Sequence, residues 1–464
     1  MKKTQFNPIS RNFSIPSIVI SKSLNWILTH ALERGYQLSF LNPKKDTGAT
    51  LTKYEERLYD HIVLFPQKLK GTATCLKFCV SINVLAMGSN LTPQILVEFL
   101  NDGGNILLAA SPSTSESLRD FARELDIDLP PRDSLFADHF SFHSSSPKNH
   151  TLVVLDEDNF LPLPHVNSIL SEETRGKKFV YRGAAHGLGT GPFLLPLIRG
   201  KSTSYVYDGK EDLDTVEDPY VSGTQAFLVS AFQARNNARV VVTCSLDMFS
   251  DEYSQYMTIL SARLLSVKVD GKQNGNKALA DDLTAWVFQE TLVIKSNYLQ
   301  HQAPNSTDLN PKVYRVETPV TVSLSLSKYN PTSQSWEQFT SPENFPVQLS
   351  VNMLDPYIRT ALPPTSSLDT ETIYSKTFIL PDHYGVFNFK VEHRVPGYTY
   401  IYEREQFTIR HRQHNEYPRF ITGAWSYYTG WLSIVVGFLV FSAIWLYHTP
   451  KPPQGRDIKV KKAQ

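Results

Sequence analysis

The fold of this chain is decided by residues 95–110, which read ILVEFLNDGGNILLAA. The apolar positions 95, 96, 99 and 100 share one face of a helix. Gly103 and Gly104 end that helix, because glycine readily takes the left-handed conformation found at helix C-termini. Residues 106–110 form an unbroken apolar run, which is typical of a strand buried on both faces of a parallel sheet. A helix followed directly by such a strand predicts an α/β fold.

The same two patterns recur on both sides of this stretch. Further buried-strand runs lie at 62–65, 152–155 and 240–242, and further helix-period faces lie at 24–32 and 118–125. Strands that alternate with helices indicate a mostly parallel sheet flanked by helices. We therefore expect an α/β domain over residues 23–268.

The apolar period changes in the second half of the chain. A polar stretch at 270–276 and a helix with apolar positions 279, 283, 286 and 287 predict a linker and helix over residues 269–290. Apolar and polar residues then alternate at 320–326, 347–351 and 387–391. Alternation with prolines between the runs predicts an antiparallel β-sandwich-like domain over residues 291–412.

One segment is suited to a membrane. Residues 425–447 carry no Asp, Glu, Lys or Arg, and 431–446 are almost continuously apolar. A helix needs about 20 such residues to cross a hydrocarbon layer of about 30 Å. Tryptophan and tyrosine gather at both ends, as in interfacial belts. We predict a single C-terminal transmembrane helix at 425–447, with a buried core helix as the alternative.

The charges beside this segment predict its orientation. The tail, residues 448–464, carries five Lys or Arg residues and one Asp, so we expect it to be cytosolic and the body lumenal. Lys461 and Lys462 form a dilysine pattern at the end of that tail, which predicts a retrieval signal; an ordinary basic stop-transfer tail is the alternative. A lumenal body requires a signal sequence. Residues 1–22 are atypical of one, because their apolar run at 15–20 is short and contains Pro16, so we expect the leader to lie outside this chain.

Composition restricts the classes of partner. The 464 residues include 46 Lys or Arg and 45 Asp or Glu, so the basic bias of nucleic-acid-binding proteins is missing and no nucleic-acid partner is predicted. Three cysteines are too few for a disulfide framework. Four Asn-x-Ser/Thr sequons are glycosylation candidates, and they begin at Asn12, Asn90, Asn149 and Asn305.

Several fragments resemble active sites only in part. Residues 200–202 read GKS, but a phosphate-binding loop needs a glycine where Leu195 stands. The glycine-rich residues 186–191 are followed by proline, which favours a loop. We predict no catalytic residue and no cofactor site from these fragments.

The cysteines and two histidines offer further partial matches, to a zinc site and to a nucleophile. Cys75 and Cys79, with His139 and His143, have spacings that zinc ligands use, but the pairs lie about sixty residues apart, so we predict no metal site. Cys244 follows a predicted strand, where a buried apolar role is favoured over a nucleophile.

Six sequence blocks resemble one known family. They are LYDHIVLF (58–65), FLNDGGNIL (99–107), QARNNAR (233–239), SLDMFSD (245–251), LDPYIR (354–359) and LPDHYGVF (380–387). Their order and content are similar to the single-span, non-catalytic subunits of the oligosaccharyltransferase complex, the 48 kDa-type subunit. The similarity runs from about residue 23 to the end of the membrane segment, but residues 1–22 and 69–89 have no clear counterpart.

The resemblance implies a function. It implies a glutamine-amidotransferase-like α/β domain, β domains and one span in the endoplasmic reticulum membrane. The family helps to assemble a complex that transfers a dolichol-diphosphate-linked oligosaccharide to asparagine, while a separate multi-span subunit carries catalysis and metal. Partners would be the other subunits and the membrane, with contact to the lipid-linked oligosaccharide only indirect. The alternatives are a membrane-anchored lumenal hydrolase and a single-span adhesion or receptor protein.

Overall fold

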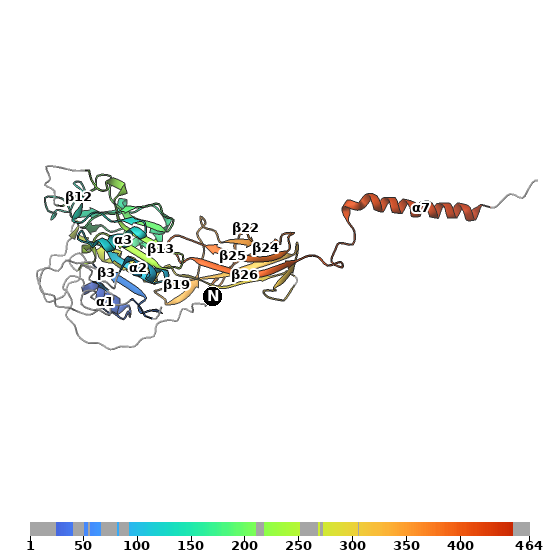
Figure 1. The fold of residues 1–464 in the computed structure, drawn as a ribbon, viewed down its shortest axis with the longest axis horizontal. Helices are drawn as coiled ribbons and strands as arrows, with labels where there is room; N and C mark the ends of the chain where they lie inside the picture. Colours follow the sequence, from blue (N-terminus) through green and yellow to red (C-terminus); the bar gives the residue numbers. More distant parts are fainter. Residues whose placement is uncertain are drawn as a thin grey trace, which may run out of the picture.

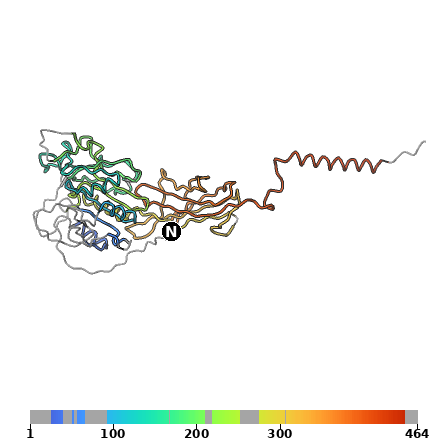
Figure 2. Tube along the Cα trace, viewed as in Figure 1, coloured from blue at the N-terminus to red at the C-terminus, as the bar shows by residue number. Residues whose placement is uncertain are grey.

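The computed structural model describes residues 25–39, 51–53, 56–65, 81–82, 92–209, 218–250, 268–269, 272–304 and 306–448. Figure 1 shows three parts in chain order: an α/β part, a β-sandwich and the helix α7 (Trp425–Tyr447), which stands apart from both. The tube in Figure 2 follows the same order from the blue helix near residue 25 to the red helix at the other end. The predicted fold class, with α/β first, β-sandwich second and an apolar helix last, is confirmed.

A six-stranded mixed sheet forms the centre of the α/β part. Its order is β11 (Leu194–Arg199), β13 (Phe227–Gln233), β14 (Arg239–Thr243), β5 (Asn105–Ala109), β3 (His61–Leu64) and β4 (Ser81–Ile82). The strands from β14 to β4 are parallel, whereas β13 runs antiparallel to both of its neighbours, β14 and β11. The predicted runs at 62–65, 106–110 and 240–242 therefore lie side by side as parallel strands.

Helices cover both faces of this sheet. On one face pack α1 (Asn25–Glu33) and α6 (Asn276–Val287), and on the other pack α2 (Pro93–Asn101) and α3 (Glu116–Glu124). Strand β5 serves both faces, since Leu107 contributes to the α1/α6 core and Ile106 and Leu108 to the α2/α3 core. Burial on both faces explains the unbroken apolar run in the sequence.

Gly103 and Gly104 end α2 as the sequence predicts. Gly103 has φ +87°, and the amides of Gly103 and Gly104 donate to the carbonyls of Leu100 and Phe99, each at 2.9 Å. This is the Schellman arrangement. A Cβ on Gly104 would lie 2.1 Å from the Phe99 ring, so the strand can follow the helix this closely only through glycine.

One predicted strand differs from the expectation. β8 (Val153–Leu155) lies outside the main sheet and pairs antiparallel with β9 (Phe179–Tyr181). Its apolar run has a different cause: Val153 and Leu155 pack into the main core, while Leu152 and Val180 cover the other side. An apolar run reports burial on both faces and does not fix the direction of pairing.

The smaller elements of the α/β part are short strands and helices. They are β1 (Thr52–Lys53), β2 (Glu56–Arg57), β6 (Ile127–Asp128), β7 (Ser134–Ala137), α4 (Pro164–Ile169), α5 (Glu172–Arg175), β10 (Gly187–Leu188), β12 (Tyr205–Asp208), β15 (Lys268–Val269) and β16 (Lys272–Gln273).

Two five-stranded sheets build the β-sandwich. The first contains β17 (Ile294–Gln302), β19 (Pro319–Asn330), β24 (Thr372–Ile379), β23 (Pro364–Ser367) and β20 (Ser335–Gln338). The second contains β18 (Val313–Arg315), β26 (Ile401–Arg410), β25 (Gly385–His393), β21 (Gln348–Asn352) and β22 (Pro356–Ala361). Except for the parallel β18–β26 pair, neighbours are antiparallel, and the alternating apolar positions face one shared core.

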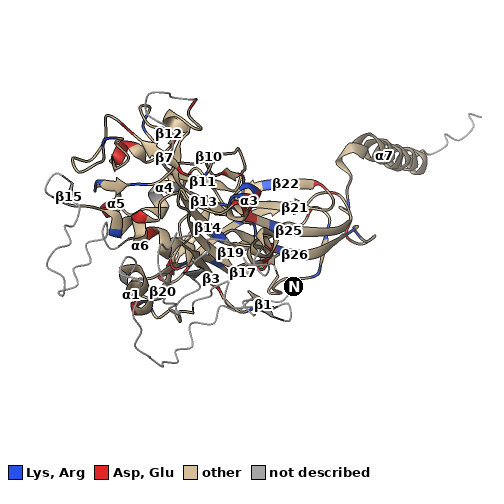
Figure 3. Ribbon diagram, turned by 60° about the vertical axis from the view of Figure 1, so that its left-hand side comes forward, with Lys and Arg blue, Asp and Glu red and all other residues tan. Residues whose placement is uncertain are grey.

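The C-terminal helix has the length and composition of a membrane span. The 26-residue helical segment Thr422–Tyr447 contains an 18-residue stretch with a mean hydropathy of 2.0, and none of its side chains is buried. Figure 3 shows α7 without a Lys, Arg, Asp or Glu residue, whereas the rest of the molecule carries both signs of charge. A long apolar helix with no protein cover is suited to lipid.

Candidate functional site

Cys244 lies where the α/β fold commonly places chemistry, at the carboxyl end of a central strand. It follows β14 directly and is 2% exposed. His186 Nδ1 lies 3.3 Å from Cys244 Sγ, and His186 Nε2 lies 2.8 Å from Ser230 Oγ. His186, which lies 44 residues from Ser230 and 58 from Cys244 in the sequence, thus brings an imidazole together with a hydroxyl and a thiol.

The environment of this trio disfavours nucleophilic chemistry. Burial lowers the pKa of His186 from 6.5 to about 3 and raises the pKa of the Cys244 thiol well above its usual range. The imidazole is therefore neutral and the thiol protonated at neutral pH, whereas a nucleophilic cysteine needs its thiolate. His186 and Ser230 are completely buried. The trio is a hydrogen-bonded part of the core, which agrees with the apolar role favoured for Cys244.

The histidines considered for zinc do not converge. His139 Nδ1 lies 2.7 Å from His150 Nδ1, and His139 Nε2 lies 2.8 Å from the Tyr205 hydroxyl. His143 instead pairs with the Ser145 hydroxyl at 2.7 Å. Within the described ranges no group of three or more His, Cys, Asp or Glu side chains could hold a metal ion. Cys75 and Cys79 lie outside the described residues.

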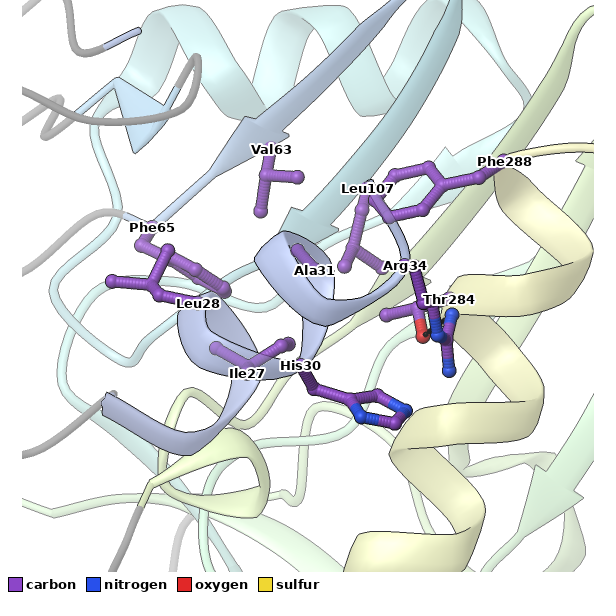
Figure 4. A pocket seen from close by; sticks show the side chains of 10 residues that line it. All are labelled: Ile27, Leu28, His30, Ala31, Arg34, Val63, Phe65, Leu107, Thr284 and Phe288. Atoms are coloured by element: carbon purple, nitrogen blue, oxygen red, sulfur yellow. Dashed lines mark hydrogen bonds between the residues drawn. The ribbon is translucent and has the colours of Figure 1, made fainter. Parts of the chain in front are cut away.

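An apolar pocket lies between α1, α6 and the strands β3 and β5 (Figure 4). Its walls include Val63, Phe65, Leu107 and Phe288, and its polar lining side chains are His30, Arg34 and Thr284. These polar groups are already engaged, mainly with carboxylates of α6 and the turn after it. The pocket therefore lies at the contact of α1 with α6 and the central sheet.

Ion pairs hold α1 in this position. Arg34 Nη1 donates to Glu290 Oε2 at 3.3 Å, and Arg34 Nη2 lies 3.5 Å from Asp281 Oδ1. His30 Nε2 lies 3.2 Å from the same Asp281 oxygen. The contacts join segments about 250 residues apart in the chain, and they hold α1 against α6 on one face of the sheet.

The block 233–239 forms the joint between the α/β part and the β-sandwich. Gln233 Nε2 donates to Tyr398 O at 2.6 Å, and Asn237 both donates to Tyr400 O at 3.1 Å and accepts from the Tyr400 amide at 2.5 Å. Asn236 donates to the carbonyls of Leu100 and Asn101, at the C-terminus of α2. The amides of the block thus tie a helix end and the β25–β26 loop to strand β14.

Arg239 is the centre of this joint. Its side chain is completely buried, and it donates to the carbonyls of Trp286, Thr291, Leu292 and Gly397 at 2.8–3.5 Å. The guanidinium also lies 4.9 Å from the centre of the Trp286 ring, and Trp286 Nε1 donates to Gly397 O at 2.8 Å. Burial lowers the pKa of Arg239 to about 9, so it stays charged at neutral pH.

Sequence reasoning did not identify this joint as a site. The signal was present, because the block combines amide side chains and arginine beside a buried strand, and long buried cations are rare unless they are paired. The positive φ of Asn237 (+68°) and Gly397 (+87°) marks the two turns that bring the partners together.

The glycosylation and retrieval candidates are mostly not described by the structure. Asn12, Asn90 and Asn305, with Lys461 and Lys462, lie outside the described residues. Asn149 is half-buried in the loop before β8, and Thr151 of its sequon is 5% exposed.

Comparison with known proteins covers nearly the whole chain. Residues 27–290 match the family model described as OST48, N-terminal domain, and residues 300–449 match the OST48 middle domain. The dolichyl-diphosphooligosaccharide–protein glycosyltransferase subunit wbp1 of Schizosaccharomyces pombe is 34% identical over 413 residues, 88% of this chain and 86% of that protein. The 48 kDa subunits of Danio rerio and Drosophila melanogaster are 32% and 29% identical over 90% and 93% of this chain, and 87% and 89% of their own lengths. The chain therefore belongs to the family of 48 kDa subunits of the dolichyl-diphosphooligosaccharide–protein glycosyltransferase, as the six sequence blocks predict.

Proposed function

We propose that this chain is a non-catalytic subunit of an oligosaccharyltransferase complex. The complex transfers a dolichol-diphosphate-linked oligosaccharide to asparagine in Asn-x-Ser/Thr of nascent proteins. The observation that carries the proposal is the family relationship, which extends from the first helix through the membrane segment. A protonated, buried thiol at Cys244 supports a role other than covalent catalysis.

The joint at Arg239 supports an assembly role. It fixes the α/β part onto the β-sandwich through hydrogen bonds inside one chain, so the body offers partners a preformed surface, which lowers the entropic cost of binding. We propose as partners the other subunits, including the multi-span catalytic one. Contact with the lipid-linked oligosaccharide would then be indirect.

The domain organisation is part of the proposal. We propose an α/β domain at 23–268, a linker and helix at 269–290, a β domain at 291–412 and a span at 425–447. The buried contacts of α6 with the main sheet support grouping 269–290 with the α/β domain in function.

Activity measurements test the central claim. The isolated chain should give no turnover with a lipid-linked donor and an acceptor peptide, whereas depletion of the chain should reduce glycosylation by the complex. Turnover by the chain without other subunits would refute the non-catalytic role. Normal glycosylation after depletion would refute the role in the complex.

The span is proposed as a site of subunit contact. Gly430, Ser433 and Gly437 follow one another at helical spacing, and no heavy atom lies within 4 Å of a Cβ built on either glycine. Small residues allow close helix packing in lipid. Gly437→Leu should lower the recovery of partner subunits after gentle detergent extraction, whereas Val435→Leu on the opposite face should not. Equal recovery of the two variants would count against the contact.

The orientation is proposed from the tail. A lumenal body and a cytosolic tail at 448–464 agree with the basic residues of that tail, and Lys461 and Lys462 would return the protein to the endoplasmic reticulum. A reporter with a neutral lumenal domain, the span and the tail should keep immature glycans. The double variant Lys461→Ser, Lys462→Ser should mature further; equal maturation of both reporters would show that the motif is inert.

The occupancy of the sequons follows from the same orientation. A lumenal body would expose Asn12, Asn90, Asn149 and Asn305 to the transferase. Removal of N-glycans should shift the mass of the chain, and Asn-to-Gln variants would assign the sites.

A further inference from the structure

A small pocket lies at the carboxyl ends of β5 and β14, beside the N-terminus of α3. It is lined by Ala110, Ser111, Pro112, Thr114, Arg119, Leu129, Pro130, Pro131, Ala184 and Cys244. Three prolines and two alanines give it stiff, apolar walls. Arg119 is the one charged residue among the described residues that line it. Open α/β sheets bind their ligands at this end of the strands.

Arg119 is a nearly buried cation whose Nε lacks a hydrogen-bond partner among the described residues. The residue is 6% exposed. Nε forms an ion pair with Glu116 Oε2 at 3.9 Å, which is too far for a hydrogen bond. The Glu116 side chain is 62% exposed, so solvent screens it. A buried charge left in this state is costly, because its hydration is lost and not replaced.

Other groups around the pocket add positive potential. The α3 helix begins here, and its N-cap Ser115 makes no side-chain capping bond; the buried Ser115 hydroxyl has no partner in the described residues. The first amides of a helix point outward and favour an anion. Arg132 acts on Arg119 as a second positive charge, and the Cys244 thiol is held protonated by burial. Glu116 is the opposing charge.

We propose that this pocket binds one small monovalent anion, a carboxylate group or an ion of similar size, through the guanidinium of Arg119. A carboxylate matches the two parallel N–H groups of a guanidinium, and one negative charge neutralises one arginine. The stiff walls and small volume exclude a bulky or multiply charged ligand. The site is separate from the family's proposed role in assembly and does not depend on it.

Thermal unfolding of the full chain in detergent micelles tests the site. Acetate, chloride and inorganic phosphate are titrated separately at constant ionic strength, with the bulky 2-(N-morpholino)ethanesulfonate as the balancing anion. Ligand that binds only the folded state stabilises it, so the midpoint should rise by roughly 1–3 °C at ten times the dissociation constant of acetate or chloride. The larger rise identifies which of the two ions the pocket prefers. A flat response to both, or a response to phosphate alone, would overturn the proposal.

Variants locate the effect. Arg119→Met should abolish the rise, whereas Arg123→Met, which removes an exposed arginine of the same helix, should keep it. If Arg119→Met does not fold, Ala184→Val gives an independent measurement, because it fills the pocket and retains the charge. Ala184→Val should lower the apparent affinity for the anion at least tenfold, as read from the anion concentration that the rise in midpoint requires. An unchanged response in Arg119→Met or Ala184→Val would place the anion elsewhere.

Discussion

The cores of the α/β part and the β-sandwich are built differently. In the α/β part, buried polar side chains such as Arg239, His186 and Ser230 lie within the core and bond segments that are far apart in sequence. In the sandwich, aromatic and aliphatic side chains dominate, with Phe389 stacked on Phe407 at 4.0 Å between ring centres. Both cores are largely apolar, and in the α/β part a buried arginine and other long-range polar contacts are added to the apolar packing. The two should therefore respond differently to substitution.

The largest effect should come from the sandwich core. Phe389 is completely buried and packs against Phe407 and His301, so Phe389→Ala removes apolar contact and leaves a cavity. We expect a loss of about 3–5 kcal/mol in unfolding free energy. Hydrogen exchange of the full chain should show the loss of protection in the sandwich strands first.

Val386→Ala on the same strand is the matched control, since Val386 is 47% exposed. It should change the unfolding free energy by less than about 1 kcal/mol. Equal loss in both variants would mean that the packing between the two sheets does not dominate this region.

A second variant separates the two regions. Arg239→Met keeps an apolar chain but removes four donated hydrogen bonds, and it leaves carbonyls of Leu292 and Gly397 without this donor. We expect a loss of about 2–4 kcal/mol, because buried polar groups that lose their partner retain the cost of desolvation. Hydrogen exchange of the full chain should then show the α/β part and the β-sandwich losing protection in two separate steps in place of one.

Arg235→Met serves as the control for Arg239, because Arg235 belongs to the same block and is exposed. In Arg235→Met the α/β part and the β-sandwich should still unfold in a single step. A single cooperative transition in Arg239→Met would show that other contacts hold the joint.

Sequence patterns predict the sandwich more fully than the α/β part. The alternation at 320–326 becomes β19, whose residues Val320, Val322, Leu324 and Leu326 are completely buried. Period-two burial is a local property, so it can be read from neighbours in the chain. The helix face at 95–100 and its glycine stop are local in the same way.

The candidate sites are non-local and escape this reasoning. His186, Ser230 and Cys244 meet only because β13 and β14 are neighbours and a bridge joins His186 to Phe227. The direction of β8 and the partners of Arg239 likewise depend on pairing over long separations. A single sequence carries residue types but not these pairings, so the joint was visible only as a block of unusual composition.

Acid should weaken both regions through buried histidines. Burial lowers the pKa of His186 to about 3 and that of His301 to about 4, against 6.5 in the unfolded chain. Above pH 6.5 both states are neutral at these sites. Below it the unfolded chain binds protons that the folded chain does not, so stability falls as the pH drops from 6.5 towards 4.

Substitution of one histidine should make this pH dependence shallower. His186→Gln should reduce the loss of stability between pH 7 and pH 5 by on the order of 1–2 kcal/mol, because one coupled proton is removed. Denaturant unfolding at both pH values measures it, and His301→Gln should act on the sandwich peptides in hydrogen exchange. An unchanged slope in His186→Gln would mean that this imidazole is protonated in the folded state.

The smallest effect concerns Lys201, which follows Gly200 in the partial match to a phosphate-binding loop. In the structure Lys201 Nζ donates to Asp156 Oδ2 at 3.0 Å, and both side chains are partly exposed. Exposed ion pairs contribute about 0.2–1 kcal/mol, so Lys201→Met should lower the unfolding free energy by less than about 1 kcal/mol. The exposed Lys148 provides the control, and Lys148→Met should have no measurable effect.

Nucleotide titration of the parent chain should give no binding signal that Lys201→Met removes, because Leu195 replaces the glycine that would let backbone amides close around a phosphate. Nucleotide binding that depends on Lys201 would contradict this and would give the α/β part a ligand beyond the anion proposed at Arg119.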